Sequence, residues 1–322
     1  MLSVRQLISG VNETLSNSKN QEFVSARYGS RATALVELGA GAWSRAYSFA
    51  LDGRDSVVRF GSYGEDFYKD KVMGERSSPE LPIPKVVDIG ETDSGFFVVA
   101  ERGRGEFLDQ LDGDNMKSVL PSVFRALDAM RDLDISQTSG YGHWNPDGTG
   151  AHENWADALL DVSIEHPRSQ GWRTALEASP DGAEVFDIGF EKLKSLVKDL
   201  PNERSIVHND LLNRNALVKD GKLSAVFDWG NSLYGDHLYD AALLLYWCSW
   251  FPKWSSVDIR EDLNDYWMSH GGLPQDVDVR LLTYQLHIGL EHIAYTAFVN
   301  RPDDLARNKK QVKTLAREIE QS

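Results

Sequence analysis

Runs of hydrophobic residues interrupted by polar ones predict a small antiparallel sheet near the start of the chain. The runs are rich in β-branched and aromatic residues, which favour strands with one buried face. Asp52-Gly53 supplies a tight turn between the second and third runs, and Thr92 to Gly95 supplies one between the last two. We expect five strands, at residues 34–38, 46–51, 56–60, 85–90 and 96–100.

In the rest of the chain, hydrophobic residues recur at helical spacing, as in the stripe from Met116 to Leu133. The run 241–251 is the most apolar, but it is only about half as long as a membrane span, so we expect a buried helix. The pattern therefore predicts two lobes, residues 1–102 with the sheet and residues 103–322 with the helices. Other helices are expected at 258–269, 280–299 and 303–319.

A group of polar residues follows a short apolar stretch in the second half of the chain. Ile206 and Val207 predict a strand, and His208, Asp210 and Asn215 come directly after it. The strand would deliver a carboxylate and a carboxamide into one short loop. A single aspartate in such a loop is more often a turn or cap residue, so the whole pattern is needed to indicate chemistry.

A predicted hairpin completes this pattern. The β-prone runs 216–219 and 223–227 are joined by Asp220-Gly221, the strongest short hairpin signal, and the hairpin returns Asp228 to the loop. Asn215 and Asp228 are hard oxygen ligands that suit Mg²⁺ shared with phosphate oxygens. Asp210 is then available to accept a proton from an attacking hydroxyl group, and these parts together meet the needs of phosphoryl transfer.

The arrangement resembles the catalytic and metal-binding loops of the aminoglycoside phosphotransferases, relatives of the protein kinases. The resemblance implies an α+β, two-lobed, protein-kinase-like fold with a small antiparallel β lobe and a larger, mainly helical lobe. It implies ATP and Mg²⁺ as cofactors, and within the family it favours the enzymes that phosphorylate hygromycin B and confer resistance. The matching stretches are FYKD at 67–70, LPIPKVVDIGE at 81–91, SQTSGYG at 136–142, VFDWG at 226–230, YGD at 234–236 and HIGLEH at 287–292.

A loop between the first two predicted strands contains Gly39, Gly41 and Ser44. Glycines let backbone N–H groups approach a phosphate closely. Two glycines between strands more often make only a turn, and the loop has neither a Walker A motif nor a full G-x-G-x-x-G. Its position resembles that of the kinase nucleotide loop, which favours phosphate binding.

Further nucleotide contacts follow from the resemblance. Arg59 occupies the strand position where most of the superfamily has lysine and the hygromycin B enzymes have arginine, and a guanidinium can bind two phosphate oxygens. The register of the following helix favours Asp70 as its acidic partner, although a solvated helix face would look the same. The Ala100 carbonyl and the Arg102 N–H are expected to contact the adenine edge.

The resemblance makes Asp210 the catalytic carboxylate and His208 a support for its loop. Asp236 or Asp240 is expected to cap the apolar helix and to order that loop. On a later helix, His287 and Glu291 share a face, and we expect both to line the acceptor site together with Trp250, with core packing as the competing role for the tryptophan. A metal site with His292 is excluded because the spacing differs from H-E-x-x-H.

The charge balance of the sequence limits which kinds of molecule the protein is expected to bind. The 34 basic residues against 49 acidic ones give a net charge of −15, which disfavours nucleic acid and anionic membranes and favours a small cationic aminoglycoside. The single cysteine, Cys248, fits a cytoplasmic protein. A monomer is favoured. The preference for ATP or GTP stays open, as do a kinase of another hydroxyl compound (an amino sugar, choline or homoserine) and a nucleotide-binding protein without catalysis.

Overall fold

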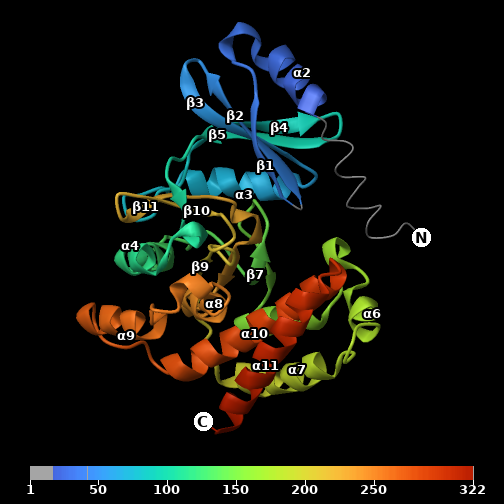
Figure 1. Cartoon of the computed structure of the whole chain (residues 1–322), viewed down its shortest axis with the longest axis vertical. Coiled ribbons are helices and arrows are strands. Elements are labelled where there is room, and N and C mark those ends of the chain that lie inside the picture. Colours follow the sequence, from blue (N-terminus) through green and yellow to red (C-terminus); the bar gives the residue numbers. More distant parts are fainter. Residues whose placement is uncertain (1–16, 42, 322) are drawn as a thin grey trace. The chain divides into compact units, whose positions relative to one another are not determined.

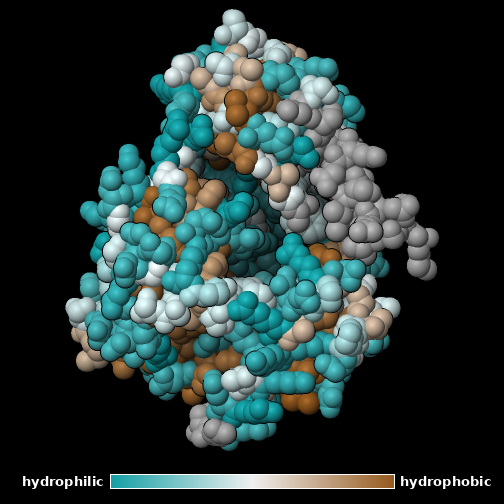
Figure 2. Space-filling model, viewed as in Figure 1, coloured by the Kyte–Doolittle hydropathy of each residue, from teal (hydrophilic) through white to brown (hydrophobic). Residues whose placement is uncertain are grey.

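The computed structural model describes residues 17–41 and 43–321 (Figure 1). The chain divides into two compact units, one of residues 1–110 and 213–231 and the other of residues 111–212 and 232–322. Each buries hydrophobic residues of its own. In the view of Figure 2, hydrophilic residues cover most of the visible surface of both units and hydrophobic residues form small separate areas.

The first unit contains the predicted five-stranded sheet. All neighbouring strands are antiparallel, in the order β1-β2-β3-β5-β4, so the last two strands exchange places relative to their order in the sequence. The strands are β1 (Val36–Ala40), β2 (Ser44–Leu51), β3 (Arg54–Gly61), β4 (Val86–Thr92) and β5 (Gly95–Glu101).

Alternation along the strands gives this sheet two different faces. One face packs against α2 (Asn17–Tyr28), where Val24 meets a cluster that includes Tyr47 and Phe60. The helix α3 (Gly64–Gly74) lies on the opposite side of the sheet (Figure 1). Arg59 sits between the buried residues Val58 and Phe60 in β3, so its side chain points to the α3 side, away from the α2 cluster.

The predicted hairpin is present and belongs to the first unit. Strands β10 (Ala216–Lys219) and β11 (Lys222–Val226) are joined by Asp220 and Gly221, with φ angles of 52° and 72°. Two positive φ angles are the mark of a type I′ turn, which matches the twist of the strands. The hairpin pairs with β6 (Glu106–Phe107), and the N–H of Val226 donates to the carbonyl of Pro82 at 2.7 Å.

The second unit is mainly helical around a small sheet of order β8-β7-β12-β9. The apolar run 241–251 lies mostly in α8, whose residues from Leu238 to Leu244 are buried, which confirms a buried helix; its last three residues fall beyond the helix end at Cys248. Among residues 17–41 and 43–321, no helix combines the length and apolar content needed to cross a bilayer. The strands are β7 (Tyr141–Trp144), β8 (Gly150–His152), β9 (Ser205–Val207) and β12 (Leu233–Gly235). The helices are α4 (Gly113–Arg131), α5 (Trp155–Leu160), α6 (Trp172–Glu177), α7 (Glu184–Leu196), α8 (Leu238–Cys248), α9 (Ile259–Ser269), α10 (Val277–Phe298) and α11 (Pro302–Gln321).

Candidate active site

An ion-pair cluster joins the sheet, helix α3 and the hairpin of the first unit. The guanidinium of Arg59 pairs with Asp70, as predicted, and its Nη1 lies 3.2 Å from Oδ1 of Asp228. Burial acts against both partners: it raises the pKa of Asp70 to about 6, although the charge of Arg59 opposes this shift. The cluster therefore concentrates one cation and two carboxylates in a partly dehydrated place.

The open end of the hairpin brings Asn215 beside the residues that precede Asp228. The N–H of Phe227 donates to the carbonyl of Asn215 at 2.9 Å, which extends the β10–β11 ladder to this point. Asn215 is 5% exposed, whereas the side chain of Asp228 is 41% exposed. The hairpin thus brings the backbones that carry Asn215 and Asp228 to one end, and a carboxamide and an accessible carboxylate are oxygen donors of the kind that fits Mg²⁺.

Gly39 and Ser44, expected in a loop, instead lie in β1 and at the start of β2, so the loop between these strands is shorter than predicted. Ser44 lies opposite Gly61 and two positions from Ala46, which lies opposite Arg59, so Ser44 and Arg59 share a sheet face. No described atom lies within 4 Å of the position that a Cβ on Gly39 would occupy. The N–H of Gly41 donates to the carbonyl of Ser44 at 2.8 Å, which closes the loop. There is thus room next to the backbone of Gly39 at the end of β1.

The two expected adenine contacts, the Ala100 carbonyl and the Arg102 N–H, lie near the end of β5 (Gly95–Glu101), and both residues have partners within the sheet. Ala100 pairs with Val57 on one side and with Val86 on the other. The N–H of Arg102 donates to the carbonyl of Asp55 at 3.2 Å. An adenine contact by this N–H would have to replace that bond.

The backbone of the loop that contains Asp210 is hydrogen-bonded to the buried carboxylate of Asp240. Asp240 of α8 accepts two consecutive backbone N–H groups, from His208 at 2.7 Å and from Asn209 at 2.9 Å. Burial raises the pKa of Asp240 to about 6, and these two bonds oppose the shift. Of the two aspartates expected to order the loop, Asp240 does so, while Asp236 accepts the N–H of Leu238 at the start of α8.

His208 lies inside the second unit and supports the loop. It is 0% exposed, and its Nδ1 accepts the N–H of Asp210 at 3.2 Å. A nitrogen that accepts this bond carries no proton, so the imidazole is neutral and its proton is on Nε2. This contact helps to fix the backbone of Asp210, whose side chain is partly exposed.

Glu291 is hydrogen-bonded to a buried Tyr239–His287 pair, of which the sequence predicted only His287 as a site residue. Tyr239 donates to Oε2 of Glu291 at 3.1 Å, and its hydroxyl lies 2.7 Å from Nδ1 of His287. Burial raises the pKa of Glu291 to about 7, and it lowers the pKa of His287 to about 3. His287 is 3% exposed, which favours a supporting role over contact with a ligand. Tyr239 was missed because a tyrosine in an apolar helix reads as core.

Trp250, expected to line the acceptor site, belongs to an aromatic cluster at the end of α8. Trp250 donates to Oε1 of Gln311 at 2.8 Å, and Arg307 covers its ring at 4.1 Å from the centroid. Trp247 packs edge-on against Trp250 at 4.8 Å and against His292 at 4.5 Å. Trp250 and Trp247 are both half-buried, so part of their aromatic surface is accessible beside His292.

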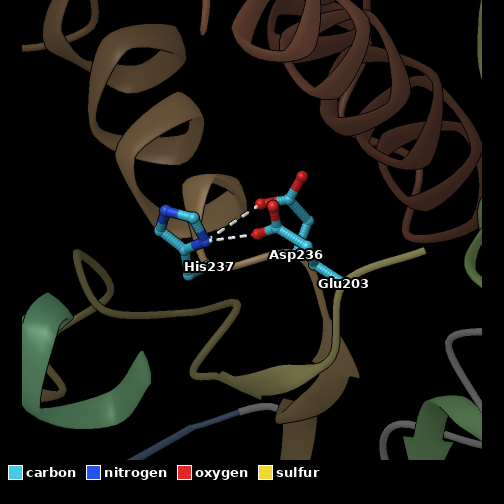
Figure 3. A group of neighbouring side chains, drawn as sticks. All are labelled: Glu203, Asp236 and His237. Atoms are coloured by element: carbon cyan, nitrogen blue, oxygen red, sulfur yellow. Dashed lines mark hydrogen bonds and ion pairs between the residues drawn. The ribbon is translucent and has the colours of Figure 1, made fainter. Parts of the chain in front are cut away.

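A second acidic cluster in the same unit is structural. Glu203, Asp236 and His237 have ligand atoms within 4.8 Å of one another, and Figure 3 shows His237 turned toward both carboxylates. Arg280, which is 2% exposed, lies 2.6 Å from Asp236 Oδ1 and 3.0 Å from Glu203 Oε2. Tyr284 also donates to Asp236. The guanidinium of Arg280 and the hydroxyl of Tyr284 already bind these carboxylates, so the network is explained without a metal.

An antiparallel sheet with an Arg–Asp pair on its α3 side, a hairpin ending in a carboxylate and an anchored H-x-D loop together define a kinase-like phosphotransferase. Residues 35–271 match the phosphotransferase enzyme family, to which the chain belongs. Hygromycin-B 4-O-kinase of Escherichia coli is 33% identical over 276 residues, which are 84% of this chain and 77% of that protein.

Solved structures agree with this assignment. A thermostable mutant of aminoglycoside phosphotransferase APH(4)-Ia, crystallised with AMP-PNP and hygromycin B, superposes with a TM-score of 0.80 at 30% identity over 92% of this chain and 97% of that one. The GDP complex of aminoglycoside 2′-phosphotransferase-IIIa, at 13% identity, shares the fold with a TM-score of 0.63 over 94% of this chain and 99% of that one. The predicted kinase-like aminoglycoside phosphotransferase fold is therefore confirmed.

Proposed function

We propose that this protein transfers the γ-phosphoryl group of ATP to a hydroxyl group of hygromycin B and so confers resistance to it. The observation that carries the proposal is the cluster of Arg59, Asp70 and Asp228, which places a fixed cation next to an accessible carboxylate. The likeness to a hygromycin-B 4-O-kinase over most of the chain supports the choice of acceptor. The protein would act as a monomer in the cytoplasm.

The first unit would bind the nucleotide. Arg59 would bind phosphate oxygens, and Asn215 and Asp228 would hold Mg²⁺, which supplies charge neutralisation during phosphoryl transfer. The space beside Gly39 and the position of Ser44 on the Arg59 face support phosphate binding there. Asn215 and Asp228 fit a hard cation because they offer oxygen atoms from neighbouring ends of one hairpin.

The adenine would meet the backbone at the end of β5. The carbonyl of Ala100 is the acceptor that we assign to the exocyclic amine. The bond from Arg102 N–H to Asp55 makes this N–H the weaker of the two expected contacts, because forming the new bond means losing the old one.

The second unit would supply the acceptor chemistry. Asp210 would accept the proton of the hydroxyl group while the hydroxyl oxygen forms its bond to the γ-phosphorus and the bond to the β,γ-bridging oxygen breaks. His208 and Asp240 would take no part in the proton transfer itself, since they bind the loop backbone and so hold Asp210 in one orientation. Such positioning contributes to rate because the reacting groups meet without a further search.

Glu291 and the tryptophans would bind the acceptor. The carboxylate of Glu291 is one third exposed (33%), so it can pair with an ammonium group, while Tyr239, whose hydroxyl is also hydrogen-bonded to His287, donates to it. Trp250 has one face covered by Arg307, so it would present its other face, together with Trp247, to the apolar side of a sugar ring.

The proposal is tested with purified protein, Mg²⁺ and ATP or GTP, offering hygromycin B, kanamycin and streptomycin in parallel. We expect phosphorylation of hygromycin B in preference to the other two, and growth on hygromycin B of a sensitive bacterium that expresses the chain. An Asp210→Asn protein is the matched control. Transfer to kanamycin alone would overturn the acceptor, and transfer to choline, homoserine or a simple amino sugar alone would replace it with another small hydroxyl compound.

A further inference from the structure

Lys69 is a buried cation in the first unit to which the proposed reaction assigns no role. It lies on α3, is 3% exposed and donates from its ammonium group to the carbonyl of Gly230 at 2.9 Å. A charge is costly to bury unless it is paired and hydrogen-bonded. An uncharged side chain of similar length would avoid this cost but would lose the bond to the carbonyl.

Lys69 and its neighbour Asp70 bind the backbone of two consecutive residues in the turn after β11. Oδ1 of Asp70 accepts the N–H of Trp229 at 2.8 Å, and Lys69 donates to the carbonyl of the next residue, Gly230. A Cβ on Gly230 would lie 2.9 Å from Cγ of Asp66, which is one turn earlier on α3, and real side chains do not approach so closely. The helix therefore lies directly against the backbone of this turn.

Asp228 begins the same turn, and packing alone does not fix its side chain. It has a positive φ angle of 66°, and its side chain is 41% exposed. The residues that follow it are held by α3, so the direction of the carboxylate depends on those bonds. The ion pair from Arg59 reaches one of its oxygens at 3.2 Å and does not restrain the backbone.

We propose that Lys69 is a positioning residue for phosphoryl transfer: by holding the carbonyl of Gly230, it keeps Asp228 oriented to bind the divalent cation that accompanies the nucleotide. This inference rests on the function proposed above. Lys69 itself touches neither substrate nor metal in this arrangement, and it acts through the backbone of the turn.

The test compares Lys69→Met with Lys71→Met in the full-length protein. Methionine fills a similar volume but cannot donate, and Lys71 is an exposed residue of the same helix. In Lys69→Met we expect the Mg²⁺ concentration for half-maximal activity to rise by about tenfold, the effect of losing one hydrogen bond to a charged group. The KM for hygromycin B should change by less than about twofold, because Lys69 binds the turn and not the acceptor.

A second measurement needs no activity. Hydrogen exchange of the peptide that contains residues 228–231, measured without nucleotide, should be faster in Lys69→Met than in the wild-type and Lys71→Met proteins, since the turn loses the hydrogen bond from Lys69 to Gly230. If Lys69→Met does not fold, Lys69→Gln keeps a shorter, neutral donor and should show the same pattern with a smaller change.

The outcomes separate this inference from the proposed function. A lowered melting temperature with unchanged Mg²⁺ dependence and unchanged exchange would mean that Lys69 only stabilises the fold, and would overturn the inference. An inactive wild-type protein would overturn the proposed function and the role in phosphoryl transfer with it, while the exchange data would still report whether Lys69 holds the turn.

Discussion

Burial sets the ionisation of single acidic residues in the second unit. The pKa of Asp240 is raised to about 6 because its carboxylate is removed from water, and that of Glu291 is raised to about 7 mainly because most of its side chain is shielded from water. Asp161 adds to the shift of Glu291, and the hydrogen bond from Tyr239 opposes it. Glu291 therefore changes charge near neutral pH, where an acceptor with ammonium groups is cationic.

We predict that hygromycin B binds more tightly as the pH rises through the pKa of Glu291. Below a pH of about 7 the carboxyl group is protonated and cannot pair with an ammonium, and above it the ion pair forms. Calorimetric titration from about pH 6 to about pH 8 measures the affinity. Glu291→Gln should flatten the pH dependence, and because the ligand titrates identically with both proteins, identical profiles would exclude this role.

The two aspartates proposed for catalysis and metal binding should respond differently to the same change. Asp210→Asn should lower kcat by at least about a hundredfold, the contribution of a positioned proton acceptor, with Mg²⁺-dependent nucleotide affinity unchanged. Asp228→Asn should weaken that affinity, because a neutral carboxamide replaces a charged carboxylate ligand of the cation. Fluorescence titration with ATP, with and without Mg²⁺, separates them, and an equal loss of binding in both variants would contradict the division of roles.

Elements of the second unit are joined by buried charges. Arg280 at the start of α10 binds Asp236, which lies 44 residues earlier, between β12 and α8. Arg280 is 2% exposed and Asp236 is 0% exposed. Four residues after Asp236, Asp240 binds the backbone of the loop that contains Asp210, so the residue that holds this loop closely follows the ion pair of Arg280 in the chain.

Arg280→Met is therefore expected to lower the free energy of unfolding by about 3–5 kcal/mol, because Asp236 would keep a buried charge without its partner. The matched control is Arg260→Met, which breaks the exposed pair with Asp278 and should cost less than about 1 kcal/mol. Urea denaturation of both variants measures the difference. Equal destabilisation would show that the buried network contributes no more than a surface ion pair.

The molecule as a whole is acidic, with a net charge of −15, and its two proposed substrates carry opposite charges. An acidic surface attracts a cationic aminoglycoside and repels ATP, and salt screens both effects. We therefore expect the KM for hygromycin B to rise with ionic strength more steeply than the KM for ATP. Initial rates between about 50 mM and about 500 mM NaCl test this prediction, and parallel changes in both constants would contradict it.

Several parts of the fold and site were predictable because they depend on neighbours in sequence. The five strands of the first unit follow from alternation, although the exchange of β4 and β5 in the sheet order depends on long-range pairing. The polar stretch after Gly140 lacks the alternation that predicts strands, yet it contains β7 and β8, which pair with each other, and β7 also pairs with β12, about 90 residues later in the chain.

The sequence by itself determined the local chemistry of this protein: the Asp220-Gly221 turn, whose residues tolerate positive φ angles, and the order of His208, Asp210 and Asn215 behind a short strand. Only the tertiary structure decided which charged residues lie inside. Lys69 reads as a solvated residue, because its partner Gly230 is 161 positions away. A buried charge is tolerated only where such a distant partner meets it, and periodicity along one helix carries no information about that meeting.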